Sequence, residues 1–341
     1  MGAFFFFLCY SAAAALFFGI ERGGFALLAP IAVVFVALPL LDELLPDDWS
    51  RAIVSESRGV YDLPLRLFAP TQLALLALAC GRAPAFAGDP WSLLALAVST
   101  GVVTGACGIT IAHELMHRRE TVNRGLAELL MSSVGYGHFT TEHVFGHHRF
   151  VATKRDPATS RLGESFYAFL PRTLFGGARS GFTIEGARVR ATGRREWSIA
   201  DGRLRWILAS LGFAAGAAAL GGAGGLLVWA GQAVVAVVLL ELINYLEHYG
   251  LERRIDAAGQ PERVQITHSW NSGRLVSGLF LFRLTRHSEH HFDATKSYER
   301  LPPGETAPQL PAGYASMLLL ALAPPLWFRV MDPRAKAVRG V

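Results

Sequence analysis

The sequence predicts an all-α integral membrane protein: a six-helix transmembrane bundle carrying a helical, histidine-rich domain on its cytoplasmic side. Three observations support this prediction. The 341 residues are 52% hydrophobic and only 17% charged, outside the norm for soluble globular proteins. Several segments are long and apolar enough to cross a bilayer as helices. All 11 histidines lie between positions 113 and 291, and nine of them stand in tight clusters or at the end of an apolar segment.

The apolar segments pair into hairpins. A transmembrane helix needs about 20 mostly apolar residues, and short turns at 21–23, 87–90 and 221–225 separate adjacent candidates. Three hairpins that enter from one side leave 42–66, 113–205 and 245–341 on that side. The predicted spans are 3–20, 24–41, 67–86, 91–112, 206–222 and 224–244.

Basic residues follow the same division. Of the 32 Lys and Arg, five lie in residues 1–112, 15 in 113–206 and the others after Tyr245. This placement fits cytoplasmic loops better than a nucleic-acid-binding surface, despite the net charge of +5. The start of the chain lacks the Lys or Arg of a signal peptide, so we expect 4–20 to be a retained span. The predicted location is the bacterial cytoplasmic membrane.

The predicted organisation has four parts. Residues 1–112 hold spans one to four, 113–205 form a cytoplasmic segment, 206–244 hold spans five and six, and 245–341 form a second cytoplasmic segment. In the last part, 317–328 is apolar but short and interrupted by proline, which favours an interfacial helix. The three cysteines lie in apolar stretches without CxxC spacing and are predicted to be buried hydrophobes: Cys9, Cys80 and Cys107.

The first histidine cluster is His113-Glu114-Leu115-Met116-His117. Residues four apart share one helix face, so both imidazoles point the same way. Taken alone, the pattern also matches H-E-x-x-H, the signature of zinc metalloproteases, with Glu114 as general base.

Further clusters change this interpretation. The second contains His143, His147 and His148, the third contains His287, His290 and His291, and His248 follows the sixth span. A single catalytic zinc uses three protein ligands. Eight histidines would instead supply four ligands to each of two metals, and with the ninth one metal would have five histidine ligands and the other four. All nine fall at one membrane face. The helical domain is therefore predicted to hold two metals, and imidazole suits iron, zinc and copper alike.

Polar residues accompany every cluster. Metal-bound histidine commonly donates its second N–H to a carboxylate, which fixes the tautomer. Polar side chains at the end of a membrane helix are costly unless they line a cavity. For this reason the amide of Asn244 is included among the predicted supporting residues. His138 and His268 lie outside the clusters and have no assigned role. The predicted supporting residues are Glu114, Glu142, Asn244, Glu247, Glu289 and Asp293.

No phosphate-binding glycine loop, GxSxG elbow or dinucleotide fingerprint is present in the sequence. Reducing equivalents must then come from a separate protein. A basic face could attract a small acidic electron carrier: Arg118, Arg119, Arg149, Lys154 and Arg155.

These motifs together resemble the membrane-bound alkane monooxygenases, integral-membrane di-iron hydroxylases related to fatty acid desaturases. The resemblance spans nearly the whole chain and is carried by 113–117, 137–148, 156–159, 163–165, 244–251, 268–272, 286–291 and 308–311. It implies two irons, held by His113, His117, His143, His147, His148, His248, His287, His290 and His291.

The resemblance also implies a reaction. One atom of O₂ enters a terminal C–H bond of a hydrocarbon, alkanes above all, and the other leaves as water. Electrons would come from rubredoxin and rubredoxin reductase, and substrate would enter from the bilayer. The chain departs from the family pattern at Thr285, where Gln is common, and at Phe292-Asp293-Ala294, and it is short for the family.

Four alternatives remain open at this point. Alkyl-aromatic methyl hydroxylases have similar clusters, and fatty acid desaturases or hydroxylases share the metal-site logic. An intramembrane zinc protease would use only the 113–117 cluster. A non-catalytic metal carrier would bind metal without oxidising a hydrocarbon.

Overall fold

The computed structural model describes residues 2–50 and 58–340. Across these two ranges the chain forms helices, turns and two isolated bridges, and contains no β-strand. The all-α prediction is therefore confirmed. Residues 51–57, within the predicted 42–66 loop, lie outside the described residues.

Five helical stretches of the described chain are long and apolar enough to cross a membrane, as a multi-pass membrane protein requires. They run over Ala3–Arg22, Gly24–Leu44, Gly59–Phe86, Pro90–Met116 and Gly202–His248. Their component helices are η1 (Ala3–Cys9), α1 (Tyr10–Arg22), η2 (Gly24–Leu28), α2 (Ala29–Ala32), η3 (Val33–Ala37), α3 (Leu38–Leu44), α4 (Arg58–Arg82), η4 (Ala83–Phe86), α5 (Pro90–Val103), η5 (Thr104–Ile109), α6 (Thr110–Met116) and α11 (Gly202–His248).

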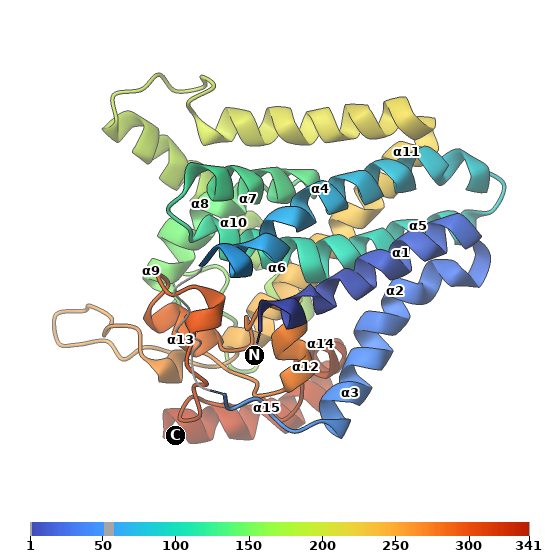
Figure 1. Ribbon diagram of the computed structural model, residues 1–341. Helices are drawn as coiled ribbons and strands as arrows, with labels where there is room; N and C mark the ends of the chain where they lie inside the picture. Colours follow the sequence, from blue (N-terminus) through green and yellow to red (C-terminus); the bar gives the residue numbers. More distant parts are fainter. Residues whose placement is uncertain (1, 51–57, 341) are drawn as a thin grey trace.

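The fifth stretch, α11, is folded back on itself. Gly221 and Gly222 have non-helical backbone angles, and Gly222 has a φ of 60°. A Cβ on Gly221 would overlap the carbonyl oxygen of Cys80, so only glycine allows this approach. Figure 1 shows the two arms of α11, one along the top of the molecule and one descending through the bundle. Whether each arm is a separate span, as the six-span prediction requires, stays a prediction.

Three predicted span boundaries differ from the structure. The third span was expected to begin at residue 67, but α4 begins at Arg58. Asp62 and Arg66, which lower the hydropathy there, are four residues apart and form an ion pair along the helix. The fourth and sixth spans continue to Met116 and His248, so the first histidine cluster begins inside a helix.

The remaining helices form the domain at one end of the bundle. The predicted interfacial segment 317–328 is broken at Leu322 and Ala323 into parts of two helices. Pro324 begins the second of them, as its fixed φ favours. These elements are α7 (Thr121–Ser133), α8 (Phe139–Glu142), η6 (His143–His147), α9 (His148–Phe150), α10 (Phe166–Ala191), η7 (Ile266–His268), α12 (Leu275–Phe280), α13 (His287–Phe292), η8 (Tyr298–Arg300), α14 (Tyr314–Ala321) and α15 (Pro324–Arg339).

The stretch Pro90–Met116 is the central helix of the bundle. Its apolar window is 83% buried, against 22% for Gly24–Leu44 at the periphery. Small residues let it approach α11 closely, because a Cβ on Gly105 would lie 2.9 Å from the Cα of Ala236. Thr104 also donates a hydrogen bond to Gln232 at 2.7 Å, which joins the two helices.

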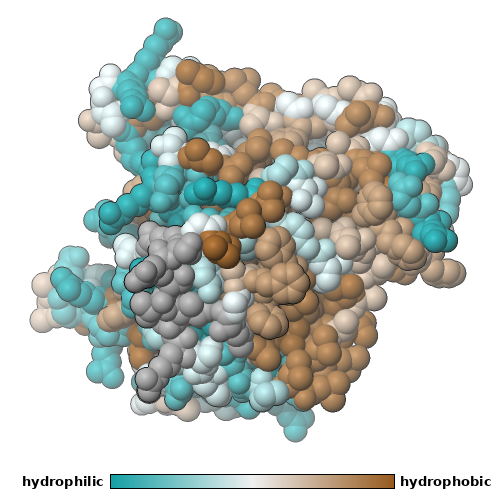
Figure 2. All heavy atoms as spheres, in the orientation of Figure 1, coloured by the Kyte–Doolittle hydropathy of each residue, from teal (hydrophilic) through white to brown (hydrophobic). Residues whose placement is uncertain are grey.

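The surface matches a membrane setting. Figure 2 shows apolar side chains over the helices that run across the view, with hydrophilic residues gathered towards both their ends. The candidate membrane spans carry exposed large apolar side chains, among them Phe5, Phe18, Phe25 and Leu227. Buried cysteines were predicted, and Cys9, Cys80 and Cys107 are all buried free thiols.

Candidate metal centre

Nine histidines from four parts of the chain converge at the end of the bundle. α6 carries His113, with His117 directly after its last turn, and α11 ends at His248. η6 and α9 carry the second cluster, and α13 carries the third. Figure 1 shows α6, α9 and α13 next to one another although they are far apart in sequence. The prediction that all clusters meet at one end of the bundle therefore agrees with the fold.

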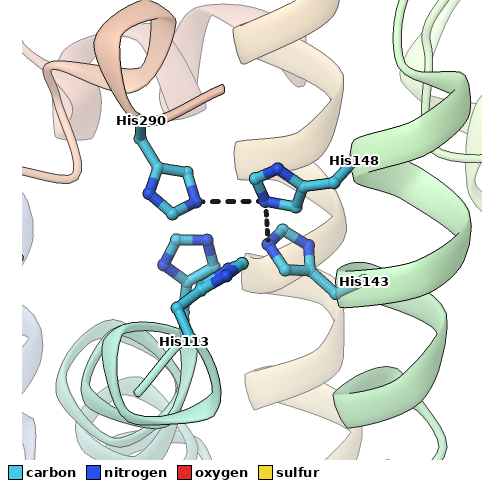
Figure 3. Close-up of side chains that lie close together, drawn as sticks. His113, His143, His148 and His290 are labelled. Carbon is cyan, nitrogen blue, oxygen red and sulfur yellow. Dashed lines mark hydrogen bonds between the residues drawn. The ribbon is translucent and has the colours of Figure 1, made fainter. Parts of the chain in front are cut away.

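The nine histidines divide into two groups. In each group, one ring nitrogen from every member lies within 4.8 Å of the others. The five-histidine group is His113, His117, His143, His148 and His290. The four-histidine group is His147, His248, His287 and His291. Figure 3 shows His113, His143, His148 and His290 pointing towards one common centre.

The distances within each group suit a metal ion. In the five-histidine group, Nε2 of His148 lies 3.1 Å from Nε2 of both His143 and His290. In the four-histidine group, the Nε2 pairs of His147 with His291 and of His287 with His248 are 3.2 Å apart. Two nitrogens that each bind one metal at about 2.1 Å lie about 3.0–3.4 Å apart.

Unsatisfied atoms point to the same conclusion. Nε2 of His113 and Nε2 of His117 are buried and have no hydrogen-bond partner among the described residues. Buried polar atoms without partners are rare in native proteins and call for an ion or water. The residues therefore fit a metal centre with one ion in each group.

Six of the nine rings, all outside the membrane-spanning segments, are neutral, the form that binds metal. Burial, followed by the neighbouring histidines, lowers the pKa of His117, His143 and His148 well below its ordinary value. The pKa values of His287, His290 and His291 are lowered in the same way. These imidazoles are neutral at neutral pH and have a free lone pair for a cation.

A π-helical turn assigns the second cluster to both groups. η6 closes hydrogen bonds over five residues instead of four. This brings His143 and His148, five apart, into the same group, while His147 joins the other. In a regular α-helix, residues four apart share a face, so periodicity alone would pair His143 with His147.

Asp156 supports His147 and was not among the predicted supporting residues. Its Oδ2 accepts from His147 Nδ1 at 2.8 Å, and Oδ1 accepts from the backbone N–H of Ala158. Burial alone would lower the pKa of His147, but the Asp156 carboxylate reverses this and raises the pKa. The hydrogen bond leaves Nε2 of His147 free to bind a metal. The 156–159 motif contained this residue, but sequence separation gave no reason to connect Asp156 with His147.

Two further contacts hold the other elements. Ser269 Oγ lies 3.4 Å from Nδ1 of His248. The side chain of Asn271 accepts from the backbone N–H of Ser288 at 2.8 Å, which fixes α13. The 268–272 motif thus supports the four-histidine group. His268 itself is turned away and pairs with Glu262 at 3.2 Å.

Glu247 lies directly beside the four-histidine group. Its Oε2 is 3.2 Å from His287 Nε2, and its Oε1 accepts from Tyr314 at 2.9 Å. Glu114, in contrast, pairs with Arg118 at 2.8 Å and accepts from the backbone of Tyr298.

The other predicted supporting residues have varied environments. Glu142 is buried, and one of its oxygens has no partner among the described residues. Asp293 bonds to Thr295 and pairs with Lys296. In the described chain, neither Asp293 nor the half-buried Glu289 hydrogen-bonds to a histidine. Asn244 donates to Glu241, a second residue that the sequence reasoning missed.

A small apolar cavity of about 20 Å³ is lined by histidines of both groups and by residues of the helix bundle. We call it the reaction pocket, and His113, His143 and His287 contribute to its wall, so that both groups border it. The other residues of the wall are Gly105, Ile109, Thr110, Phe139, Leu240, Ile243, Asn244, Glu247 and Leu284.

Of the predicted basic face, Arg118 does not belong to the surface. Its side chain is 9% exposed and pairs with Glu114 and Asp62. Arg119, Arg149, Lys154 and Arg155 are exposed.

Comparison with known proteins gives a consistent result. A family model described as fatty acid desaturase matches residues 89–320. An alkane 1-monooxygenase of Acinetobacter baylyi is 38% identical over 315 residues, covering 91% of this chain and 77% of the relative. Alkane 1-monooxygenase 1 of Pseudomonas aeruginosa is 39% identical over 314 residues, covering 90% and 82%. The hydroxylase component of a xylene/toluene monooxygenase from Pseudomonas putida is 31% identical over 306 residues, covering 88% and 80%.

Proposed function

This chain belongs to the alkane monooxygenase family of membrane oxidoreductases, and we propose that it hydroxylates the terminal carbon of hydrocarbons, alkanes first. The reaction joins RH, O₂, two electrons and two protons to give ROH and H₂O. The observation that carries the proposal is the apolar reaction pocket bordered by both histidine groups. An alkane has no polar group, so an apolar pocket against the metal centre is the site it requires.

The proposed cofactor is a pair of iron ions, one for each group, held by the nine histidines. When bound, iron supplies the capacity to activate O₂ and to transfer one oxygen atom. The chain supplies neutral imidazoles, and Asp156 keeps His147 in the tautomer that presents Nε2. Glu247 and Tyr314 form a hydrogen-bonded wall beside His287. Apolar residues exclude water, which limits loss of oxidising equivalents to solvent.

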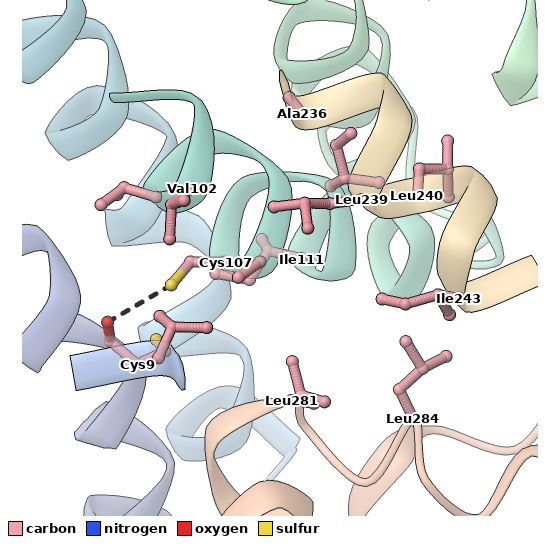
Figure 4. Close-up of a cluster of buried hydrophobic side chains, with 14 of the residues drawn as sticks. Cys9, Val102, Cys107, Ile111, Ala236, Leu239, Leu240, Ile243, Leu281 and Leu284 are labelled. Carbon is pink, nitrogen blue, oxygen red and sulfur yellow. Dashed lines mark hydrogen bonds between the residues drawn. The ribbon is translucent and has the colours of Figure 1, made fainter. Parts of the chain in front are cut away.

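We propose that the hydrocarbon enters from the bilayer through two neighbouring apolar cavities. A second apolar cavity of about 30 Å³ is lined by η3, α12 and α14. Ile243 belongs to the walls of both cavities, with Leu281 in one and Leu284 in the other. Figure 4 shows Ile243 on α11 extending towards Leu284. Each cavity holds about one or two water molecules, so an alkyl chain must displace these side chains to reach the histidines.

The proposed electron donor is rubredoxin, reduced by its reductase. Four exposed cations, Arg119, Arg149, Lys154 and Arg155, favour an acidic carrier. His148 is half-buried and adjacent to Arg149, so electrons would reach the five-histidine group first. We propose that this face is cytoplasmic and the membrane is the bacterial inner membrane, as the distribution of basic residues favours.

The test is a product assay with the full chain in lipid nanodiscs. Purified protein, rubredoxin, reductase and NADH are supplied with alkanes, alkyl-aromatics and fatty acids, and iron is measured in the same sample. We expect about two irons per chain and 1-alkanols as products. The His248→Ala variant should lose both one iron and the activity. One zinc per chain with no oxidation of any hydrocarbon would overturn the proposal.

The same panel separates the closest rival. The xylene/toluene relative favours an alkyl-aromatic methyl hydroxylase as the second candidate. Faster oxidation of a methylarene than of any alkane would select it. A desaturase would instead yield an alkene from a fatty acyl substrate.

A further inference from the structure

A buried carboxylate in α11, Glu241, is not used by the proposed reaction. Its side chain is 1% exposed and accepts three hydrogen bonds. Tyr136 donates to Oε1 at 2.8 Å, and Thr173 donates to Oε2 at 2.8 Å. Asn244 donates its amide N–H to Oε2 at 3.1 Å. An ionisable residue within a membrane helix is costly and most often functional.

Asn244 separates two cavities. It lines the reaction pocket on one side and, with Glu241, a cavity of about 10 Å³ on the other. The amide nitrogen is turned towards Glu241. Because the amide nitrogen is hydrogen-bonded to Glu241, Oδ1 is the amide atom left to face the reaction pocket, whose wall includes Asn244. Oδ1 forms no hydrogen bond within the described residues.

The chemistry of Glu241 decides which end of the amide faces the pocket. Both carboxylate oxygens of Glu241 accept hydrogen bonds, from Tyr136, Thr173 and Asn244, so the carboxylate holds the NH₂ end of the Asn244 amide rather than its oxygen. The pocket therefore receives an acceptor.

Substrate and product differ in the group that such an acceptor recognises. An alkane carries no hydrogen-bond donor, whereas a 1-alkanol brings one hydroxyl into an apolar cavity. A hydroxyl without a partner is costly to bury. An acceptor next to the histidines thus favours the product and leaves the binding of the substrate unchanged.

We propose that Glu241 is a positioning residue that fixes the Asn244 amide with its oxygen in the reaction pocket, where it accepts a hydrogen bond from the alcohol product. This inference rests on the proposed function for the identity of the ligand. The contacts that carry it are independent of any metal.

The test measures the affinities of a 1-alkanol and of the alkane of equal length for metal-free protein in nanodiscs. The ratio of the 1-alkanol affinity to the alkane affinity is then compared between variants. Each ligand partitions into the lipid equally in every sample, so this partitioning cancels in the comparison. Asn244→Ala should weaken 1-alkanol binding about two- to tenfold, the range for one uncharged hydrogen bond, with alkane binding unchanged. Glu241→Met should have the same effect. In the Asn244→Ala background, Glu241→Met should cause no further change in the ratio.

Two matched variants keep the carboxylate beside Asn244. Tyr136→Phe and Thr173→Val each remove one other donor to Glu241, and should leave the ratio at its wild-type value. The inference is overturned if these variants lower the ratio as much as Glu241→Met does. It is also overturned if Asn244→Ala leaves the ratio unchanged in a protein that hydroxylates alkanes. Failure of the proposed function would show separately, as a wild-type protein that produces no alcohol.

Discussion

Replacing Asp156 by Asn should remove metal from one histidine group and leave the other. In the wild type, Oδ2 accepts from His147 Nδ1 at 2.8 Å and from Thr159 at 2.6 Å, while Oδ1 accepts from the Ala158 N–H at 3.0 Å. An Asn side chain has one acceptor and one donor end. If its NH₂ faces His147, the ring must carry its hydrogen on Nε2, the atom 3.2 Å from His291 Nε2, and cannot bind metal there.

The other orientation is no better. If the Asn oxygen faces His147, its NH₂ meets the N–H of Ala158, and two buried donors oppose each other. Loss of a hydrogen bond that orients a metal ligand typically weakens metal binding 10- to 100-fold, about 1.4–2.7 kcal/mol. We therefore expect the iron proposed for the four-histidine group to need about 10 to 100 times higher free Fe²⁺ for half-saturation, with the five-histidine group unaffected.

Metal content after equilibration at fixed free Fe²⁺, with Mössbauer spectra to separate the two irons, measures this effect. Asp293→Asn is the matched control, because Asp293 bonds only Thr295 and Lys296 among the described residues. The reasoning is refuted if Asp156→Asn retains both irons at wild-type affinity, if it loses both together, or if the control loses iron equally.

Three further outcomes are expected. Ile243→Ala should open the route between the two apolar cavities and shift the preferred alkane to longer chains; an unchanged product profile across a chain-length series would contradict this. Acidification should release iron from the four-histidine group first. The Asp156 carboxylate raises the pKa of His147, whereas burial lowers the pKa values of the five-histidine rings that lie outside the membrane helices, so a proton displaces the metal from His147 at a higher pH. Metal release in the opposite order during a pH titration would refute the assignment. Gly105→Ala should destabilise the bundle by about 1–3 kcal/mol by overpacking against α11, seen as a lower thermal midpoint, whereas Gly81→Ala, with open space around its Cβ position, should not lower it.

Part of the site was open to prediction because its signals are local. His113 and His117 share a helix face at a spacing of four, and hydropathy places His113 and His248 at the ends of long apolar segments. The number of clustered histidines, nine, also predicted five ligands for one metal and four for the other without any geometry. Boundaries were less predictable, since Asp62 and Arg66 lower the hydropathy of a segment that is nevertheless helical.

The supporting residues were harder to identify. A carboxylate next to a histidine in sequence was the signal used, and it identified Glu247, which lies beside His287. It missed Asp156, which is nine residues from His147, and Glu241, which is three residues from Asn244 but faces Tyr136 and Thr173. The same signal selected Glu114, whose carboxylate pairs with Arg118 instead of a histidine.

The sequence by itself determined the helical membrane class and the nine clustered histidines, because hydropathy and helical spacing are properties of short segments. Only the tertiary structure decided which histidines share a group, and which carboxylates and amides face them. That grouping depends on the π-helical turn of η6 and on contacts such as His147 with His291, 144 residues apart. Local periodicity carries no information about either, since both follow from how the packed helices bring distant segments together.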